Sequence, residues 1–402
     1  MGDMGDTGAD RRASDHERFE ELRVAAVERL NLFATPGEER FDRITRIARE
    51  LFDVPVAEIN LLDQTQQFTK SPQPRDANPF APRSQSFCDI AIQRPGVLVV
   101  PDATKDERFA SRDTVTGERH IRFYVGRPLS LGDDLRVGTL CLVDTTPREF
   151  SDEQLKLLEE IGDWVERELQ DSADLDRAAE VQQQLLPMGQ PGLPMFEVAG
   201  VCLPSRTVAG DFYSWHGTEG RIELTLADVM GKGTAGAILA ATVRAAFQAQ
   251  TGVDVLPAVE QVNEQLALDL GATGSFATLF HARIDTTTGR MDFADAGHGL
   301  TIVLHPDGSS ERLEATGLPI GIVADGLWTA SETVLGAGDR LITFTDGLLD
   351  LYDGTLESLD EIAALVSGAD SPADAVRAIT ELVRAADRAD DDVTAVVVFR
   401  SA

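Results

Sequence analysis

The chain has 402 residues, 43% of them hydrophobic, so it is long enough to bury large cores and to form two or three domains. Its net charge of −32 argues against a duplex-binding face, because nucleic-acid phosphates need Lys and Arg for neutralisation, and it disfavours anionic membranes. The three cysteines (Cys88, Cys141, Cys202) form neither a disulfide framework nor a zinc pattern. No apolar stretch has the length of a signal peptide or a membrane span. We therefore expect a cytoplasmic protein.

The first part of the chain is predicted to be a small α/β domain that follows a disordered tail. Residues 1–17 have little to bury and are expected to be disordered. An amphipathic helix is predicted over 17–32, and a second helix is predicted to begin at Thr35, which would cap it, with Pro36 at the first helical position. Strand-like stretches follow at 57–62, 86–92, 96–101, 121–125 and 137–144. This order of elements favours a domain with a ligand pocket.

These stretches resemble a GAF domain over residues 18–169. The resemblance is carried by Phe41 to Leu62, Phe87 to Ala91, Arg122 to Leu129 and Gly138 to Thr145. It implies an antiparallel sheet with flanking helices that binds an unknown small-molecule or protein signal, or that serves as a dimerising platform. Cys88 and Cys141 are candidates for redox sensing, although a buried cysteine in a strand is more often inert packing.

Residues 151–187 are predicted to form a linker helix. Ser151 is placed to cap it, with Glu153 and Gln154 near the reciprocal capping position. The apolar positions form two stripes separated by the polar residues 170–174, namely Leu155, Leu158, Ile161, Val165 and Leu169, then Leu175, Ala178, Val181 and Leu185. The heptads are too few for a firm coiled coil, so two interpretations stay open: a homodimer seam that transmits a signal, which we expect, and a helix docked on its own domain.

Four aspartates in short motifs mark the remaining segment, 188–402. They are Asp211 in Val208-Ala-Gly-Asp-Phe-Tyr213, Asp228 in Ala227-Asp-Val-Met-Gly-Lys-Gly233, Asp346 in Thr343-Phe-Thr-Asp-Gly347, and Asp391 in Asp390-Asp-Asp-Val-Thr394. Each adjoins an apolar stretch of strand-like composition, which places the carboxylates at strand ends. A packed scaffold can bring strand ends together, although a single Asp-Gly pair is an ordinary turn signal.

Converging carboxylates repel one another unless a hard divalent cation with oxygen ligands binds between them. The four motifs contain no His or Cys, which argues against zinc or copper and for Mg²⁺ or Mn²⁺. Two such ions supply a hydroxide near neutral pH and neutralise a transferring phosphoryl group. Metal-assisted hydrolysis of a phosphate ester is therefore the reaction that this composition favours.

In this order the motifs resemble metal-dependent protein phosphatases of the PPM class, in the SpoIIE-like branch that dephosphorylates anti-sigma-factor antagonists. The resemblance extends from Ala178 to Phe399. It implies an α+β protein in which a PPM αββα sandwich, with a two-metal site between its sheets, follows the GAF-type sheet. The implied metal ligands are Asp228 as the bridge between the ions, the Val229 carbonyl in one shell, Asp346 and Asp391 on the other ion, and Asp211 directly or through water. The implied catalytic residues are Asp228 and Asp211.

Several positions depart from the family pattern. Ala209 stands where a second glycine is usual, Ser214 where an aspartate often follows Phe-Tyr, Asp295 where asparagine is common, and Asp350 where glutamate is frequent. None of them removes an implied metal ligand. They bear on substrate fit and on the loops round the site.

Two further residues invite a catalytic interpretation. His298 lies between two glycines and is interpreted as a structural residue, because such a histidine at a strand end is more often a satisfied one than a general acid. Lys232 lies in a Gly-Lys-Gly sequence, but the spacing of a nucleotide-binding loop is absent. Lys232 either faces a substrate phosphate or starts the apolar helix predicted over 234–247.

The sequence therefore predicts a GAF-regulated, Mg²⁺- or Mn²⁺-dependent serine/threonine phosphoprotein phosphatase with two ions. The resemblance implies a phosphorylated STAS-type anti-sigma-factor antagonist as its substrate. Two alternatives are a catalytically silent scaffold that only binds a partner, and an enzyme that acts on a small phosphate ester.

Overall fold

The computed structural model describes residues 7–73, 78–132, 135–187, 189, 192, 195–218, 220–324, 326–386 and 390–401. The chain divides into two compact units, Met1–Asp176 and Arg177–Ala402. The long helix α5 (Asp152–Leu185) contributes to both of them. Among the described helices, none is long and apolar enough to cross a membrane.

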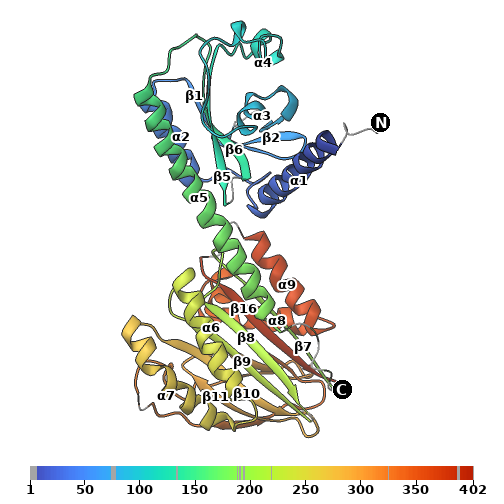
Figure 1. The fold of residues 1–402 in the computed structure, drawn as a ribbon. Helices are drawn as coiled ribbons and strands as arrows, with labels where there is room; N and C mark the ends of the chain where they lie inside the picture. Colours follow the sequence, from blue (N-terminus) through green and yellow to red (C-terminus); the bar gives the residue numbers. More distant parts are fainter. Residues whose placement is uncertain are drawn as a thin grey trace, which may run out of the picture. The chain divides into compact units, whose positions relative to one another are not determined.

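The first unit is a six-stranded antiparallel sheet with helices on both faces (Figure 1). The strands follow the order β3-β2-β1-β6-β5-β4 and are β1 (Val56–Leu62), β2 (Gln66–Ser71), β3 (Phe80–Pro82), β4 (Leu98–Val100), β5 (Phe123–Leu131) and β6 (Leu135–Asp144). The helices are α1 (Thr7–Arg29), α2 (Glu39–Leu51), α3 (Phe87–Ile92), α4 (Asp113–Thr116) and the first part of α5. Short 3-10 turns lie at Arg83–Gln85 and Ala103–Lys105.

Two cores lie on opposite faces of this sheet because successive strand residues point to opposite sides. Phe123 and Val125 of β5 pack with α1, α2 and α5, whereas Tyr124 between them packs with α3. The predicted apolar face of α2 is buried, and full burial of a side chain such as Phe41 contributes about 1.5–3 kcal/mol relative to exposure. The GAF-type sheet with flanking helices is therefore confirmed.

Three local predictions in this unit were wrong. Residues 7–17 are helical, because the run from Ala9 to Ala13 is rich in good helix formers and extends α1 toward the N-terminus; residues 1–6 lie outside the described part. The stretch 86–92 forms helix α3 rather than a strand, and the Ser86 side chain caps it by accepting from the Cys88 N–H at 2.9 Å. Thr35 caps no helix, since its hydroxyl binds Leu32 O and the buried Lys70, and α2 begins at Glu39.

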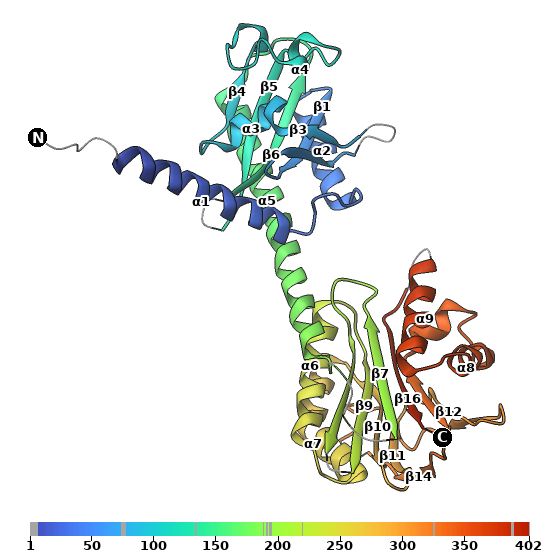
Figure 2. The ribbon, with the colours of Figure 1, turned by 90° about the vertical axis from the view of Figure 1, so that its right-hand side faces the viewer.

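The second unit consists of two packed five-stranded sheets with a pair of helices on each outer face (Figure 2). One sheet has the order β14-β11-β10-β9-β8 and the other β13-β12-β15-β16-β7, and all strand pairs are antiparallel. The first sheet comprises β8 (Asp211–Thr218), β9 (Arg221–Val229), β10 (Ala277–Asp285), β11 (Arg290–Ala296) and β14 (Ser331–Val334). The second comprises β7 (Phe196–Leu203), β12 (Thr301–Leu304), β13 (Ser310–Leu313), β15 (Arg340–Phe344) and β16 (Val393–Arg400).

Four helices cover the two sheets. Helices α6 (Thr234–Ala249) and α7 (Val255–Thr273) pack on the sheet of β8, and α8 (Leu359–Ser367) and α9 (Pro372–Ala385) pack on the sheet of β16. Short 3-10 turns lie at Asp346–Leu351 and Leu356–Ser358. Between the sheets, side chains such as Leu224 and Phe280 meet Val396 and Val398, all of them at most 1% exposed. The predicted αββα sandwich is confirmed, and so is a helix at 234–247.

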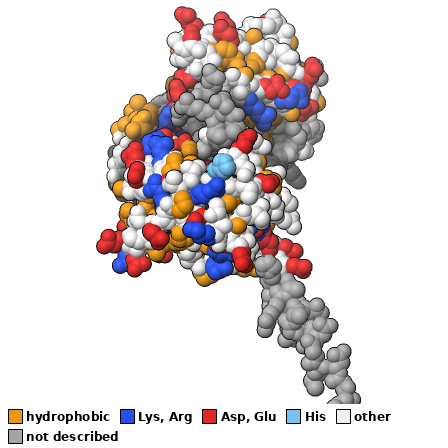
Figure 3. Space-filling view, turned by 90° about the horizontal axis from the view of Figure 1, so that it is seen from above, with side chains coloured by type: hydrophobic (Ala, Val, Ile, Leu, Met, Phe, Trp, Pro, Cys, Tyr) orange, Lys and Arg blue, Asp and Glu red, His pale blue; other side chains and the backbone are white. Residues whose placement is uncertain are grey.

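Charged side chains are mixed on the surface despite the net charge. On the face shown in Figure 3, acidic and basic side chains lie interspersed. Some of these opposite charges contact each other directly, as in the ion pairs Lys105–Asp102 and Arg108–Asp106. Such surface pairs are screened by solvent and salt, so they contribute little to stability.

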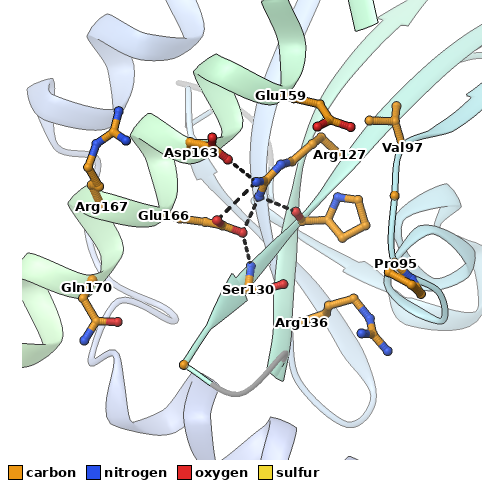
Figure 4. Close-up of a pocket in the computed structure, with 13 residues that line it drawn as sticks. Pro95, Val97, Arg127, Ser130, Arg136, Glu159, Asp163, Glu166, Arg167 and Gln170 are labelled. Carbon is orange, nitrogen blue, oxygen red and sulfur yellow. Dashed lines mark hydrogen bonds and ion pairs between the residues drawn. The ribbon is translucent and has the colours of Figure 1, made fainter. Parts of the chain in front are cut away.

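The first half of α5 is fixed to the sheet of the first unit. The stripe from Leu158 to Leu169 lies in the core of that unit. Arg127 of β5 lies beside a pocket of about 620 Å³ and forms ion pairs with Asp163 and Glu166 of the helix (Figure 4). Gly162 makes this approach possible, because a Cβ there would lie 2.4 Å from Arg127 Cδ.

The two stripes of α5 thus differ. The first stripe is docked on its own unit, as one interpretation of the linker predicted. In the second stripe, Val181 is 52% and Leu185 40% exposed, so this part of the helix is free within the described residues to contact another surface. The homodimer stays a prediction.

Candidate metal centre

Two of the four aspartates lie opposite one another on neighbouring strands. Asp211 is the first residue of β8, and Asp228 is the last but one residue of β9. The antiparallel register pairs them directly. Asp211 is 3% exposed, so its carboxylate lies in the interior, where charge is poorly solvated.

The other two aspartates come from the second sheet. Asp346 follows β15 and begins a 3-10 turn, and Asp391 precedes β16, which pairs with β15. Thr345 joins the two sheets: its hydroxyl donates to Asp211 Oδ2 at 2.7 Å and accepts from the Thr394 N–H at 3.0 Å. All four predicted carboxylates therefore lie at strand ends around the junction of the two sheets.

The electrostatics show that these carboxylates interact. Burial, and then the charge of Asp228, raise the pKa of Asp211 well above its usual range. Burial, and then the charges of Asp346 and Asp391, raise the pKa of Asp228 to about 6. Burial, and then the Asp391 and Asp350 carboxylates, also raise the pKa of Asp346. A divalent cation would relieve this repulsion and hold the carboxylates ionised.

A cation is already close to one member of the set. Lys232 Nζ lies 2.9 Å from Asp391 Oδ2 and donates to Asp390 O at 2.8 Å, and its pKa is raised by the hydrogen bond to Asp391. Among the described residues, no three His, Cys, Asp or Glu side chains are gathered tightly enough to hold a metal ion as they stand. The donor set consists of carboxylates, and those of Asp211, Asp228 and Asp346 have a raised pKa, which fits a hard divalent cation. Asp391 would have to give up its ion pair with Lys232 to bind such a cation.

Asp392 is an important residue that the sequence did not single out. Its Oδ1 accepts from the Ser205 N–H at 2.7 Å and the Ser205 hydroxyl at 3.0 Å, and its Oδ2 accepts from the Gly210 N–H at 2.7 Å. It therefore ties the strand end of Asp391 to the segment before Asp211. The run of three aspartates at 390–392 marks this strand end in the sequence, but it does not tell which aspartate is the candidate metal ligand and which one binds Ser205 and Gly210.

Gln182, in the last turns of α5, was also missed as an individual residue. Its side-chain amide donates to Ala209 O at 2.8 Å, and its Oε1 accepts from Ala209 N at 2.9 Å. Both contacts lie within the second unit. The last turns of α5 thus hold the backbone two residues before Asp211, and the Gln182–Gln184 run did not reveal which glutamine does so.

At Gly210, the backbone of the Asp211 motif lies very close to the backbone of the Asp228 motif. A Cβ at this position would lie 2.7 Å from Gly231 O and 3.0 Å from Val229 O. Glycine is therefore required by the close approach rather than by a turn. The neighbouring Ala209, where a second glycine was expected, is fully buried and fits the core between the sheets.

The surroundings of His298 fit a structural role, which stays a prediction. Its Nε2 lies 3.2 Å from Thr343 Oγ1, and burial lowers the pKa of the ring to about 4, so it stays neutral. Asp295, the departure noted in this motif, accepts from the N–H groups of His298 and Gly299 at 2.7 and 2.8 Å. A carboxylate at this position therefore holds the turn.

Comparison with known proteins assigns both units. A model of the family described as Stage II sporulation protein E (SpoIIE) matches residues 218–401, and a GAF domain model matches 36–169. The chain combines a GAF domain with a SpoIIE-family PPM phosphatase domain. The SpoIIE match begins after Asp211, so that motif rests on the geometry alone.

Several known proteins are similar to parts of the chain. Phosphoserine phosphatase RsbU of Bacillus subtilis is 27% identical over 193 residues, which cover 47% of this chain and 57% of the relative. Cyclic di-GMP phosphodiesterase PA2567 of Pseudomonas aeruginosa is 40% identical over 129 residues, 32% of this chain and 22% of the relative. A crystal structure of the RsbU and RsbW domains of Rv1364c from Mycobacterium tuberculosis has 27% identity and a TM-score of 0.47, over 54% of this chain and 63% of that one. The chain spans between 22% and 57% of the length of the curated relatives it matches.

Proposed function

We propose that the protein is a metal-dependent serine/threonine phosphoprotein phosphatase whose activity is regulated through its GAF domain. The observation that carries the proposal is the set of four interacting carboxylates at the strand ends of two facing sheets, with the pKa of Asp211 and Asp228 raised by burial and mutual repulsion. The SpoIIE family assignment and the similarity to a phosphoserine phosphatase support the same reaction.

Each carboxylate has a place in this proposal. Asp228 would be the ligand shared by two Mg²⁺ or Mn²⁺ ions, and the Val229 carbonyl would contribute to one of them. Asp346 and Asp391 would hold the second ion, and Asp211 would hold metal directly or through water. When bound, such ions supply an activated water and neutralise the phosphoryl oxygens.

Other residues of the chain hold these groups in place or act on the substrate. Thr345 orients the Asp211 carboxylate by donating to it, and Asp392 fixes Gly210 beside it. Lys232, 42% exposed, and Arg206, whose guanidinium would lie 3.7 Å from a Cβ at Gly233, flank the loop after Asp228. We assign these two cations to the phosphate group of the substrate, where they would offset its charge before and during transfer.

The substrate that best fits the family is a phosphorylated STAS-type anti-sigma-factor antagonist, and the signal at the GAF domain is a small molecule or a protein. A homodimer formed along the exposed second stripe of α5 would allow the GAF domains to act on the phosphatase domains. Cytoplasmic action follows from such a substrate.

A phosphatase assay on candidate phosphoproteins tests the proposal. The full chain should release phosphate from a phosphorylated STAS-type protein with Mn²⁺ or Mg²⁺ present, and should stop when EDTA is added. Phosphate release from p-nitrophenyl phosphate but from none of the phosphoproteins would favour the small-ester alternative. Stable binding of the phosphoprotein without turnover in any metal would favour the silent scaffold.

A further inference from the structure

Two cysteine thiols in the first unit contact the same side-chain amide. Cys141 lies in β6 and Cys88 in α3, and they are 1% and 3% exposed. Asn60 Nδ2 lies 3.2 Å from Cys141 Sγ and 3.8 Å from Cys88 Sγ. Both thiols also belong to the same core, which includes Tyr124. The proposed phosphatase chemistry uses neither of them.

The orientation of the Asn60 amide is fixed by its own partners. Its Oδ1 accepts from Gln67 Nε2 at 3.0 Å and from Thr69 Oγ1 at 2.8 Å. An amide oxygen only accepts hydrogen bonds, so these two donors fix which end of the Asn60 amide is the oxygen. The NH₂ group at the other end then faces the sulfurs. The network therefore aims N–H donors at the thiol pair, and donors stabilise a thiolate over a thiol.

The two thiols are not equivalent. The Tyr124 hydroxyl donates to Cys88 Sγ at 3.5 Å. Burial would raise the pKa of Cys88, but its polar neighbours, Cys141 first and Tyr124 among them, outweigh it and lower the pKa to about 7. The neighbouring Cys88, and then burial, raise the pKa of Cys141 well above its usual value. Cys88 is therefore the thiol that ionises first, unlike the inert packing usual for buried cysteines.

We propose that Cys88 and Cys141 form a dithiol that hydrogen peroxide oxidises to a disulfide, with Cys88 as the attacking and Cys141 as the resolving residue. The Cys88 thiolate attacks one peroxide oxygen, the O–O bond breaks, and the departing hydroxide takes a proton to become water, which leaves a sulfenic acid. The Cys141 thiol then gives up its proton and attacks the Cys88 sulfur. The S–O bond breaks, the S–S bond forms, and a second water departs.

In sum, two thiols and one peroxide yield one disulfide and two waters. The bond would join α3 to β6 across the core on that face of the sheet. Hydrogen peroxide is close in size to water and would reach the thiols through local opening of the six-residue helix α3. This chemistry lies in the first unit and does not depend on the proposed phosphatase function.

Peroxide treatment of the full chain, followed by denaturation and maleimide alkylation, tests the proposal. We expect the loss of two of three alkylation sites, a Cys88–Cys141 cross-linked peptide in mass spectra, and recovery of both sites with dithiothreitol. Cys202 is the internal control, because it is also buried and burial followed by the Asp211 charge raises its pKa. Retention of all three sites, or loss of Cys202 at the same rate, would overturn the proposal.

Three variants test the roles of the two thiols. In Cys141→Ser, oxidation should stop at a Cys88 sulfenic acid that dimedone traps. Tyr124→Phe keeps the ring and removes only the hydroxyl donor; if the Cys88 pKa rises by one unit from about 7, oxidation at pH 7 should be roughly fivefold slower. A sulfenic acid at Cys141 in Cys88→Ser, formed at the wild-type rate, would contradict the assignment of Cys88 as the attacking thiol.

Discussion

Replacing Gln182 with alanine should weaken the candidate metal centre without touching a ligand. The substitution removes both hydrogen bonds to Ala209 and leaves one N–H and one C=O unpaired in a partly buried place. At about 1–2 kcal/mol for each orphaned group, the backbone that precedes Asp211 loses about 2–4 kcal/mol of local stabilisation. If all of that cost falls on the metal-binding conformation, metal affinity decreases by up to about three orders of magnitude, since 1.4 kcal/mol is tenfold.

The assay is a titration of phosphatase activity with Mn²⁺, accompanied by urea unfolding. Gln182→Ala should require a higher Mn²⁺ concentration for half-maximal activity and recover near-normal turnover at saturation. Gln184→Ala is the matched control, because Gln184 is exposed on the same helix. If both variants have the same metal requirement and the same stability, α5 does not position the loop of Asp211.

The remaining predictions concern the ligands, the histidine and the linker. Asp346→Asn should abolish turnover and leave a folded protein by circular dichroism, and full activity in this variant or in EDTA would contradict the metal mechanism. His298→Ala should lower activity only modestly, because the ring is neutral and bonded to Thr343, and a phosphohistidine trapped at this residue would show otherwise. Leu186→Gln places an amide in the core between the sheets and should change activity or metal affinity, whereas Leu185→Gln, at a 40% exposed position, should mainly change self-association measured by light scattering. A Leu186→Gln protein with unaltered activity and metal dependence would make the linker a passive tether.

Much of the fold was predictable because, in most segments, the local sequence pattern favours the same helix or strand that the folded chain contains. The apolar stretches of strand-like composition in both units, and the motif aspartates at their ends, follow from residue order alone. The stretch 86–92 was misjudged because a short apolar run does not separate strand from helix, and the deciding contact is the Ser86 cap on Cys88. Threonine is a residue type that often caps a helix, but the hydroxyl of Thr35 instead accepts a hydrogen bond from Lys70, which is distant in the sequence.

The parts of the site that escaped prediction depend on contacts between distant segments. Nothing local distinguishes Gln182 from its neighbours or Asp392 from Asp391; only their partners at Ala209 and Gly210 do. The pairing of Lys232 with Asp391 is of the same kind, since 159 positions separate the two residues and only the folded chain brings them together. Residue order predicted the candidate donors, and only the fold shows which residues hold them in place.

Direct measurement of Mn²⁺ binding tests the central claim, that carboxylates from two sheets form a metal centre. The loss of the free Mn²⁺ electron paramagnetic resonance signal should show two ions bound by the wild-type chain. Asp228→Asn, which alters the proposed bridging ligand, should lose at least one of them together with phosphatase activity. Asp285→Asn should bind as the wild type does, because Asp285 is a half-buried residue of β10 that pairs with Arg221, at the other end of β9 from Asp228. Absence of Mn²⁺ binding by the folded wild-type chain, or binding by Asp228→Asn equal to the wild type, would contradict the account.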